Sequence, residues 1–167
     1  GGMQRAGVKA RPHAVAARAR KGVEDGLRGM PGCTVIQGHA RFESARIVRV
    51  GDEELTAPRM FINVGGRASV PDMPGVGDVP FLTNTSILAL DRVPRHLVVV
   101  GGSYVGLEFA QMFRRFGAEV TVVEKGPRLI GREDEDISQS IAEILQGESI
   151  AVRTNSTCIA LAPHDEG

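Results

Sequence analysis

Residues 97–124 read LVVVGGSYVGLEFAQMFRRFGAEVTVVE, which is an apolar segment, a glycine turn, an amphipathic segment and a second apolar segment ending on an acid. This order is typical of a βαβ unit that binds a dinucleotide. The run 97–100 suits a parallel strand buried on both faces, and Gly101 and Gly102 break it where the chain must turn. The helix that follows points its amino end at the turn, where its N–H groups and dipole favour a pyrophosphate. The sequence therefore predicts a nicotinamide dinucleotide site.

The spacing of small residues supports this interpretation. Gly106 follows Gly101 by five residues, the spacing that lets a helix pack closely against its strand. Ser103 occupies the second glycine position of the GxGxxG pattern. Serine is small enough to keep the phosphate turn, and its hydroxyl is an additional hydrogen-bond donor. The alternative at this point is a βαβ turn with a purely structural role.

The helix and the second strand fit the same unit. Apolar residues recur at the three- and four-residue intervals of a buried helical stripe, at Val105, Phe109, Met112, Phe113 and Phe116. Gly117 can end this helix, because glycine readily takes the left-handed conformation found after helix ends. The valines of residues 120–123 then supply the next strand.

Glu124 is the candidate ribose-binding acid. It follows Gly101 by 23 residues, close to the spacing of about 20 found in dinucleotide-binding folds. A carboxylate can accept hydrogen bonds from both ribose hydroxyls and repels a 2′-phosphate, so NADH is favoured over NADPH. Lys125 is also expected beside the cofactor, and together with Arg128 it keeps NADPH as the alternative. The remaining alternative is a surface acid at a strand end.

Composition excludes several classes of partner. The chain has 167 residues, 42% hydrophobic and 24% charged, as in a globular protein. Twenty basic and twenty acidic residues cancel, which predicts no nucleic-acid partner. No apolar run is long enough to span a bilayer, so no membrane partner and a cytoplasmic location are expected. Two cysteines and four histidines are scattered without ligand spacing, so we expect no metal site.

The chain divides into two predicted regions, 1–80 and 81–167. The first contains a helix at 12–29 and a small meander of the segments CTVIQG, ARIVRV, ELTA and RMFINV within 33–64. Residues 65–80 are rich in glycine and proline and should form an extended crossover. The second region adds a short helix at 85–90, a helix near 134–146, and strands at 149–153 and 157–162.

Two runs carry a family resemblance: VVVGGSYVGLEFAQMFRRFGAEVTVVEKGPRLIGREDEDIS, and MFINVGGRASVPDMPGV some forty residues earlier. They resemble the pyridine nucleotide-disulphide oxidoreductases, most closely the branch similar to mercuric reductase, with dihydrolipoamide dehydrogenase as another member. The resemblance implies an α/β, Rossmann-like nicotinamide domain at 81–167 and an incomplete flavin-domain remnant at 1–80. It implies that the segment around Gly65, Gly66 and Arg67 touches FAD. Val64 replaces a threonine often found there.

The resemblance also implies roles within the glycine turn. Gly101, Gly102, Ser103 and Gly106 resemble the pyrophosphate turn, which includes Val105. Tyr104 resembles the aromatic residue that gates the nicotinamide pocket, and Glu108 resembles the helix acid near the nicotinamide. The structural alternatives are that Tyr104 packs on the sheet and that Glu108 is a solvated first-turn acid.

Several family features have no counterpart in this sequence: the first FAD-binding glycine fingerprint, the paired redox cysteines, and the interface domain. We therefore expect an internal piece of a homodimeric parent that passes hydride from NADH to FAD. The piece alone should bind the nicotinamide cofactor without turnover, and no catalytic residue is assigned within it. The alternative is a non-catalytic scaffold domain that uses a dinucleotide fold.

Overall fold

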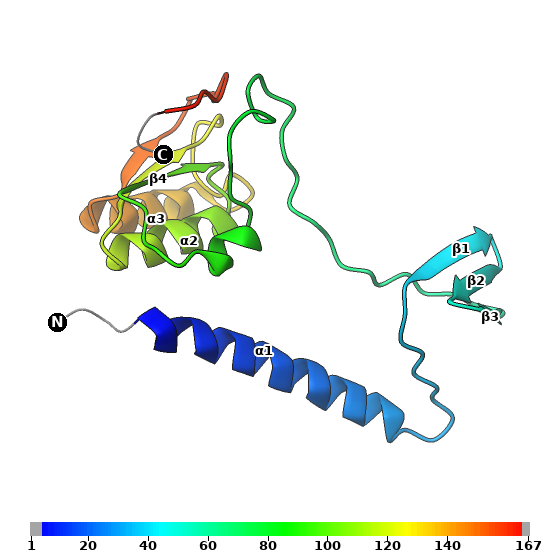
Figure 1. The fold of residues 1–167 in the computed structure, drawn as a ribbon. Helices are drawn as coiled ribbons and strands as arrows, with labels where there is room; N and C mark the ends of the chain where they lie inside the picture. The colour runs from blue at the N-terminus through cyan, green and yellow to red at the C-terminus, as the bar shows by residue number, and fades with distance from the viewer. Residues whose placement is uncertain (1–4, 165–167) are drawn as a thin grey trace. The chain divides into compact units, whose positions relative to one another are not determined.

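The protein comprises two compact units, residues 1–67 and residues 68–167 (Figure 1). This computed structural model describes residues 5–164, with side chains from residue 14 onward. The units divide between residues 67 and 68, within the segment 65–80 that is rich in glycine and proline. Residues 68–80 join the second unit because the Leu161 N–H donates to the Pro74 carbonyl at 2.9 Å. A Cβ atom at Gly75 would lie 1.8 Å from the Leu161 carbonyl oxygen, so the two segments touch through their backbones.

The first unit begins with helix α1, Arg5–Arg28, which starts earlier than the predicted 12–29. Its described side chains are almost all exposed. Ion pairs between residues four apart join Lys21 to Asp25 and Arg28 to Glu24. Such local pairs and favourable helix propensity support α1. Within residues 5–164, no helix combines the length and apolar character needed to cross a bilayer.

Three antiparallel strands form the meander of the first unit, in the order β1–β2–β3: β1 Ala40–Ser44, β2 Ile47–Val50 and β3 Glu53–Leu55. A meander was predicted, but the predicted strands at 33–38 and 59–64 are wrong. A strand needs a hydrogen-bonding neighbour, and neither segment pairs with a strand in the described chain. Arg49 on β2 contacts Glu43 and Glu54 on either side, which stabilises the cross-strand register.

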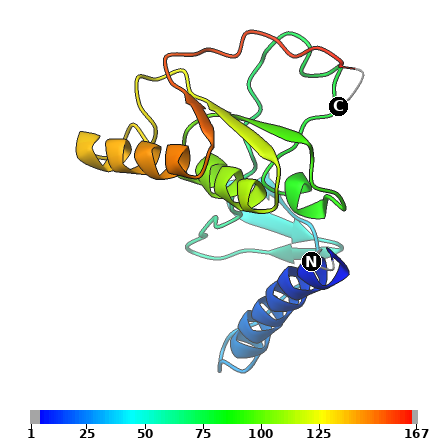
Figure 2. The same ribbon diagram turned by 90° about the vertical axis from the view of Figure 1, so that its left-hand side faces the viewer.

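The second unit contains a parallel sheet in the order β4–β5–β6: β4 His96–Val100, β5 Glu119–Val123 and β6 Ala151–Arg153. Helices α2, Tyr104–Arg115, and α3, Glu135–Gly147, connect these strands. Both lie on the same side of the sheet (Figures 1 and 2). A 3₁₀ helix at Ser86–Ala89 precedes the sheet. This arrangement confirms the α/β, Rossmann-like fold, but the strand predicted at 157–162 is not formed.

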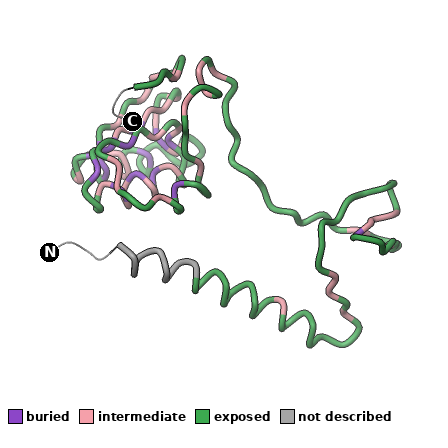
Figure 3. Tube along the Cα trace, in the orientation of Figure 1, coloured by how far each residue is buried: buried purple, intermediate pink, exposed green. Residues whose placement is uncertain are grey.

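The core of the second unit lies between its sheet and its two helices (Figure 3). Leu97, Val120 and Val122 point toward the helices and are buried. On the opposite side of β4, Val98 and Val100 are 55% and 50% exposed. The prediction that β4 is buried on both faces is therefore wrong, because α2 and α3 both lie on one face of the sheet (Figures 1 and 2).

The predicted apolar stripe of α2 is confirmed in part. Phe113 is buried, and Phe109 and Met112 are partly buried against the core, whereas Val105 and Phe116 are exposed. Leu107 and Ala110, which were not predicted, are also buried, so the contact face is shifted from the predicted stripe. The predicted end of α2 is confirmed: residue 117 is a glycine at φ +100°, and the bonds that close the last turn form a Schellman motif.

Glu148, just after α3, joins the ends of α2 and α3. Arg115 donates to its two carboxylate oxygens, at 2.9 Å from Nε and 2.6 Å from Nη2. Gln111 donates at 2.6 Å, and Arg114 donates to the Glu148 carbonyl at 2.9 Å. The hydrogen bond from Arg115 lowers the pKa of Glu148 below its ordinary value of 4.5. The same contact raises the pKa of Arg115.

We expect this contact to make stability depend on pH. Because the native pKa of Glu148 is depressed, its contribution is fully present above the unfolded pKa and is lost as pH falls through the native pKa. Wild-type protein should therefore melt at a higher temperature than Glu148→Gln near neutral pH, and the difference should vanish in acid. Thermal melts between about pH 3 and pH 7 test this. Glu143→Gln, on the exposed side of α3, is the control; a pH-independent difference for Glu148→Gln would contradict the prediction.

Candidate dinucleotide site

The glycine turn links the end of β4 to the start of α2. Gly101 has φ +106°, in the left-handed region that side chains disfavour. Its N–H donates to the Val123 carbonyl at 2.8 Å, which ties the turn to the end of β5. The turn therefore requires glycine at this position for its backbone conformation.

Gly106 lies where α2 approaches β4 most closely. A Cβ atom there would be 2.8 Å from the Gly101 carbonyl oxygen and 3.0 Å from Cγ1 of Val99. The first distance is shorter than a carbon side chain tolerates and its partner is backbone, whereas the second would require the Val99 side chain to move. The packing predicted from the five-residue spacing is thus present: only glycine fits between helix and strand here.

The amino end of α2 presents free donors. Ser103 is the N-cap residue, with φ −87° and ψ 164°, and its side chain makes no capping bond. The first intrahelical bond runs from the Leu107 N–H to the Ser103 carbonyl at 3.1 Å. The N–H groups of residues 104–106 therefore have no acceptor within the helix. No acidic residue occupies the first turn, so these donors suit a pyrophosphate.

Tyr104 and Glu108 extend from the same end of α2. Tyr104 is 68% exposed, so the alternative in which it packs on the sheet is wrong. Glu108 is also exposed and follows it by one helical turn. Residues four apart lie on one helix face, so the two exposed side chains share one face of α2.

Glu124 points into the loops around the turn. Its Oε2 accepts the Gly102 N–H at 2.6 Å, and its Oε1 accepts the Gly126 N–H at 2.6 Å. Glu124 thus lies at the end of β5 as a half-buried acid bonded to backbone N–H groups, and it is not a fully exposed surface acid. Gly102, predicted to contact the pyrophosphate, directs its N–H to this carboxylate.

Sequence reasoning missed the contribution of the loop after β5. Leu129 is 1% exposed although it lies outside every helix and strand. Its Cδ2 would lie 2.6 Å from a Cβ atom at Gly102, and the Ile130 N–H donates to the Gly102 carbonyl at 2.8 Å. An apolar pair inside an otherwise charged and glycine-rich loop was the feature that could have indicated this contact.

The two basic residues after Glu124 differ in their contacts. Lys125 is exposed. Arg128 donates through Nη2 to the carbonyls of Gly131 and Glu133, at 3.3 and 3.2 Å. Its guanidinium thus stabilises the loop, whereas Lys125 and Arg153, both beside Glu124, are open to solvent.

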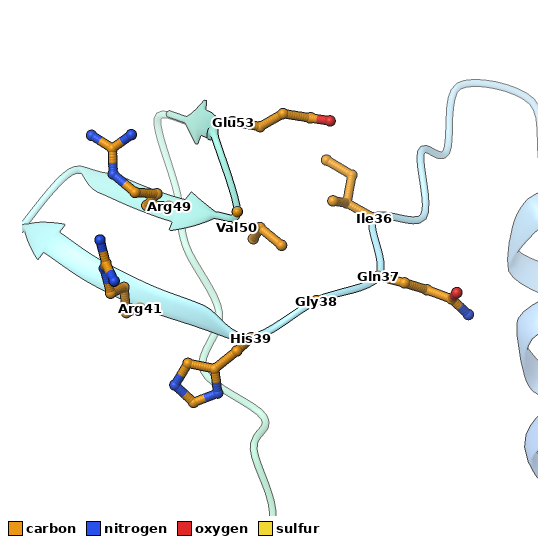
Figure 4. A pocket seen from close by; sticks show the side chains of 9 residues that line it. Ile36, Gln37, Gly38, His39, Arg41, Arg49, Val50 and Glu53 are labelled. Carbon is orange, nitrogen blue, oxygen red and sulfur yellow. The ribbon is translucent and has the colours of Figure 1, made fainter.

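The residues expected to contact FAD lie in the first unit. Gly65, Gly66 and Arg67 are exposed, within a run from 61 to 70 that is exposed throughout, and Gly65 has φ +70°. A separate hollow of about 380 Å³ lies beside the meander (Figure 4). It is lined by Ile36, Gln37, Gly38, His39, Arg41, Arg49, Val50, Gly51 and Glu53. None of the three predicted FAD contacts lines this hollow.

Metal-binding side chains are not gathered at either unit. Among the residues that the structure describes, no group of three or more histidine, cysteine, aspartate or glutamate side chains could hold an ion. Cys33 and Cys158 are both free thiols and half-buried.

Comparison with known proteins adds independent findings. A family model described as pyridine nucleotide-disulphide oxidoreductase matches residues 3–166. A mercuric reductase from Bacillus cereus is 36% identical over 126 residues, covering 75% of this chain and 20% of that protein. The probable pyridine nucleotide-disulfide oxidoreductase RclA of Escherichia coli strain K12 is 36% identical over 144 residues, covering 83% and 33%. This chain thus spans about a fifth to a third of their lengths.

A solved structure gives the same picture of the fold. The HOCl-induced flavoprotein disulfide reductase RclA from Escherichia coli matches with a TM-score of 0.83 at 34% sequence identity. The match covers 94% of this chain and 37% of that chain.

Proposed function

Because this chain belongs to the pyridine nucleotide-disulphide oxidoreductase family, we propose that its second unit binds the nicotinamide dinucleotide of a flavin-dependent, mercuric-reductase-like oxidoreductase. The observation that carries the proposal is the glycine turn with free N–H donors at the start of α2. A pyrophosphate needs close backbone approach and a positive helix end. The turn offers both, since Gly106 brings α2 against β4 and no acid occupies the first turn.

Each residue of the site has a proposed task. The N–H groups of Tyr104, Val105 and Gly106 would hold the pyrophosphate, with the Ser103 hydroxyl as a further donor. Exposed Tyr104 and Glu108 would line the nicotinamide end. When bound, NADH supplies a hydride and FAD accepts it. The protein's part is to position the dinucleotide and to exclude water from its reactive ring.

The preference for NADH rests on Glu124. Two of its hydrogen-bonding positions are used by Gly102 and Gly126. A carboxylate has about four such positions, so two remain for the ribose hydroxyls. Its charge disfavours a 2′-phosphate, and Arg128 is engaged with its own loop. Exposed Lys125 would lie beside the cofactor, and its positive charge would offset part of that repulsion.

The first unit would contribute to the FAD site of the whole protein. Gly65, Gly66 and Arg67 follow an apolar stretch in which Phe61 is 89% exposed. Exposed apolar side chains of this kind are typical of surfaces that a ligand or a further segment covers. On this proposal, the 167-residue chain binds NADH but does not turn over by itself.

A titration of the 167-residue chain with NADH and NADPH tests the proposed preference. We expect NADH to bind at least about tenfold more tightly than NADPH. This factor corresponds to about 1.4 kcal/mol, which NADPH loses through repulsion of its 2′-phosphate and through the missing ribose contact. Quenching or enhancement of the reduced nicotinamide fluorescence gives both dissociation constants. Equal constants would contradict the assignment of Glu124, and absence of binding by either cofactor would contradict the dinucleotide site itself.

A further inference from the structure

We infer that Glu124 is a positioning residue, whose carboxylate shapes the glycine turn and the loop after β5 before any cofactor arrives. The inference rests on the proposed function for the identity of the cofactor, but its structural part does not. One Glu124 oxygen accepts the Gly102 N–H and the other accepts the Gly126 N–H, both at 2.6 Å. A single side chain thus joins the glycine turn to the loop after β5, in addition to the backbone hydrogen bond from the Ile130 N–H to the Gly102 carbonyl.

Backbone bonds make Glu124 a junction of three loops. Its N–H donates to the Arg153 carbonyl at 2.8 Å, and its carbonyl accepts the Ser156 N–H at 2.9 Å. The Asn155 N–H donates to the Gly126 carbonyl at 2.8 Å. The segments after β4, β5 and β6 therefore meet around Glu124, at the carboxyl edge of the sheet where ligands of such folds bind.

The two glycines make this contact possible. A Cβ atom at Gly102 would lie 3.1 Å from Oε2 of Glu124, and one at Gly126 would lie 3.1 Å from Oε1. Side chains at these positions would crowd the carboxylate. Because they lack side chains, Gly102 and Gly126 let the Glu124 carboxylate reach their backbone N–H groups. This is in addition to any close approach of the backbone to a phosphate.

The two possible roles of Glu124 predict opposite effects on NADPH. If Glu124 only contacted the ribose, removing its charge would relieve the repulsion of the 2′-phosphate and improve NADPH binding. If it also positions the turn, removal leaves two partly buried N–H groups without their acceptor. The pyrophosphate donors then lose their arrangement, and both cofactors should bind less well.

Glu124→Gln in the 167-residue chain tests the inference, because it keeps the shape of the side chain. The amide offers one acceptor oxygen and turns an NH₂ group toward the other backbone N–H. Without ligand, we expect hydrogen exchange to accelerate at least about tenfold for at least one of the Gly102 and Gly126 amides, the one that faces the NH₂ group, while the Val122 amide in the core exchanges as before. At a temperature where circular dichroism shows a folded variant, NADH and NADPH should each bind at least about tenfold more weakly.

Glu119→Gln is the matched control, since Glu119 is an exposed acid on the same strand. It should leave exchange and both affinities unchanged. Unaltered exchange at Gly102 and Gly126, or tighter NADPH binding in Glu124→Gln, would overturn the inference. The exchange measurement needs no cofactor, so a wild-type chain that binds neither cofactor would refute the proposed function while leaving the positioning role open to its own test.

Discussion

Replacing Gly106 with valine is expected to abolish measurable NADH binding and to destabilise the second unit. The first branched atom would meet the Gly101 carbonyl at 2.8 Å and Val99 Cγ1 at 3.0 Å. The backbone partner cannot rotate away, so α2 must move from β4. Overpacking of this kind lowers the free energy of unfolding by about 1–3 kcal/mol. Moving the N–H donors by about 1 Å can weaken an interaction that depends on their position by about a hundredfold.

The measurement is NADH titration of the Gly106→Val and Gly106→Ala chains, with thermal melts beside it. Alanine should act in the same direction with a smaller effect. Gly147→Val is the control, because Gly147 ends α3 and a Cβ atom there would meet nothing within 4 Å. Wild-type affinity in a folded Gly106→Val chain would show that close packing of α2 on β4 is irrelevant to binding.

Truncating Leu129 to alanine should cause a large loss of stability, although the residue lies outside the helices and strands. Leu129 is 1% exposed and packs against Gly102. Removing a fully buried leucine side chain costs about 2–5 kcal/mol. For a unit of this size, we expect the melting temperature to fall by about 10 °C or more. The cavity would lie beside the glycine turn, so NADH affinity should fall as well.

Thermal melts and NADH titration of Leu129→Ala provide the test. Ile144→Ala removes a similar volume from the exposed side of α3 and should change the melting temperature by only a few degrees. If both variants behaved alike, the loop after β5 would be a surface connection, and its burial of Leu129 would have no energetic consequence.

Local sequence patterns predicted the second unit well. The apolar run, the glycine turn and the amphipathic segment correctly located β4, α2 and β5, because strand and helix periodicities are properties of short segments. The Schellman end of α2 followed from one glycine, since few other residues adopt its conformation. The close approach of α2 to β4 at Gly106 was predicted from the spacing of Gly101 and Gly106 alone. The geometry of a strand, a turn and a helix fixes where a residue five positions after the turn lies.

Other features depended on partners distant in the sequence. The segments at 33–38, 59–64 and 157–162 have strand-like composition but form no strand, since pairing requires a neighbour in the right register. The exposed face of β4 could not be predicted either. An apolar strand has the same sequence pattern whether one or both of its faces are covered.

The sequence by itself thus determined the order of elements, the glycine turn and the presence of an acid at the end of β5, because each is encoded within a few consecutive residues. Only the tertiary structure decided what that acid contacts. Glu124 reaches Gly102 across the sheet edge and Gly126 within its own loop, and Leu129 fills the space beneath the turn. These contacts join segments whose separation in space is set by strand pairing and core packing, which no local pattern records.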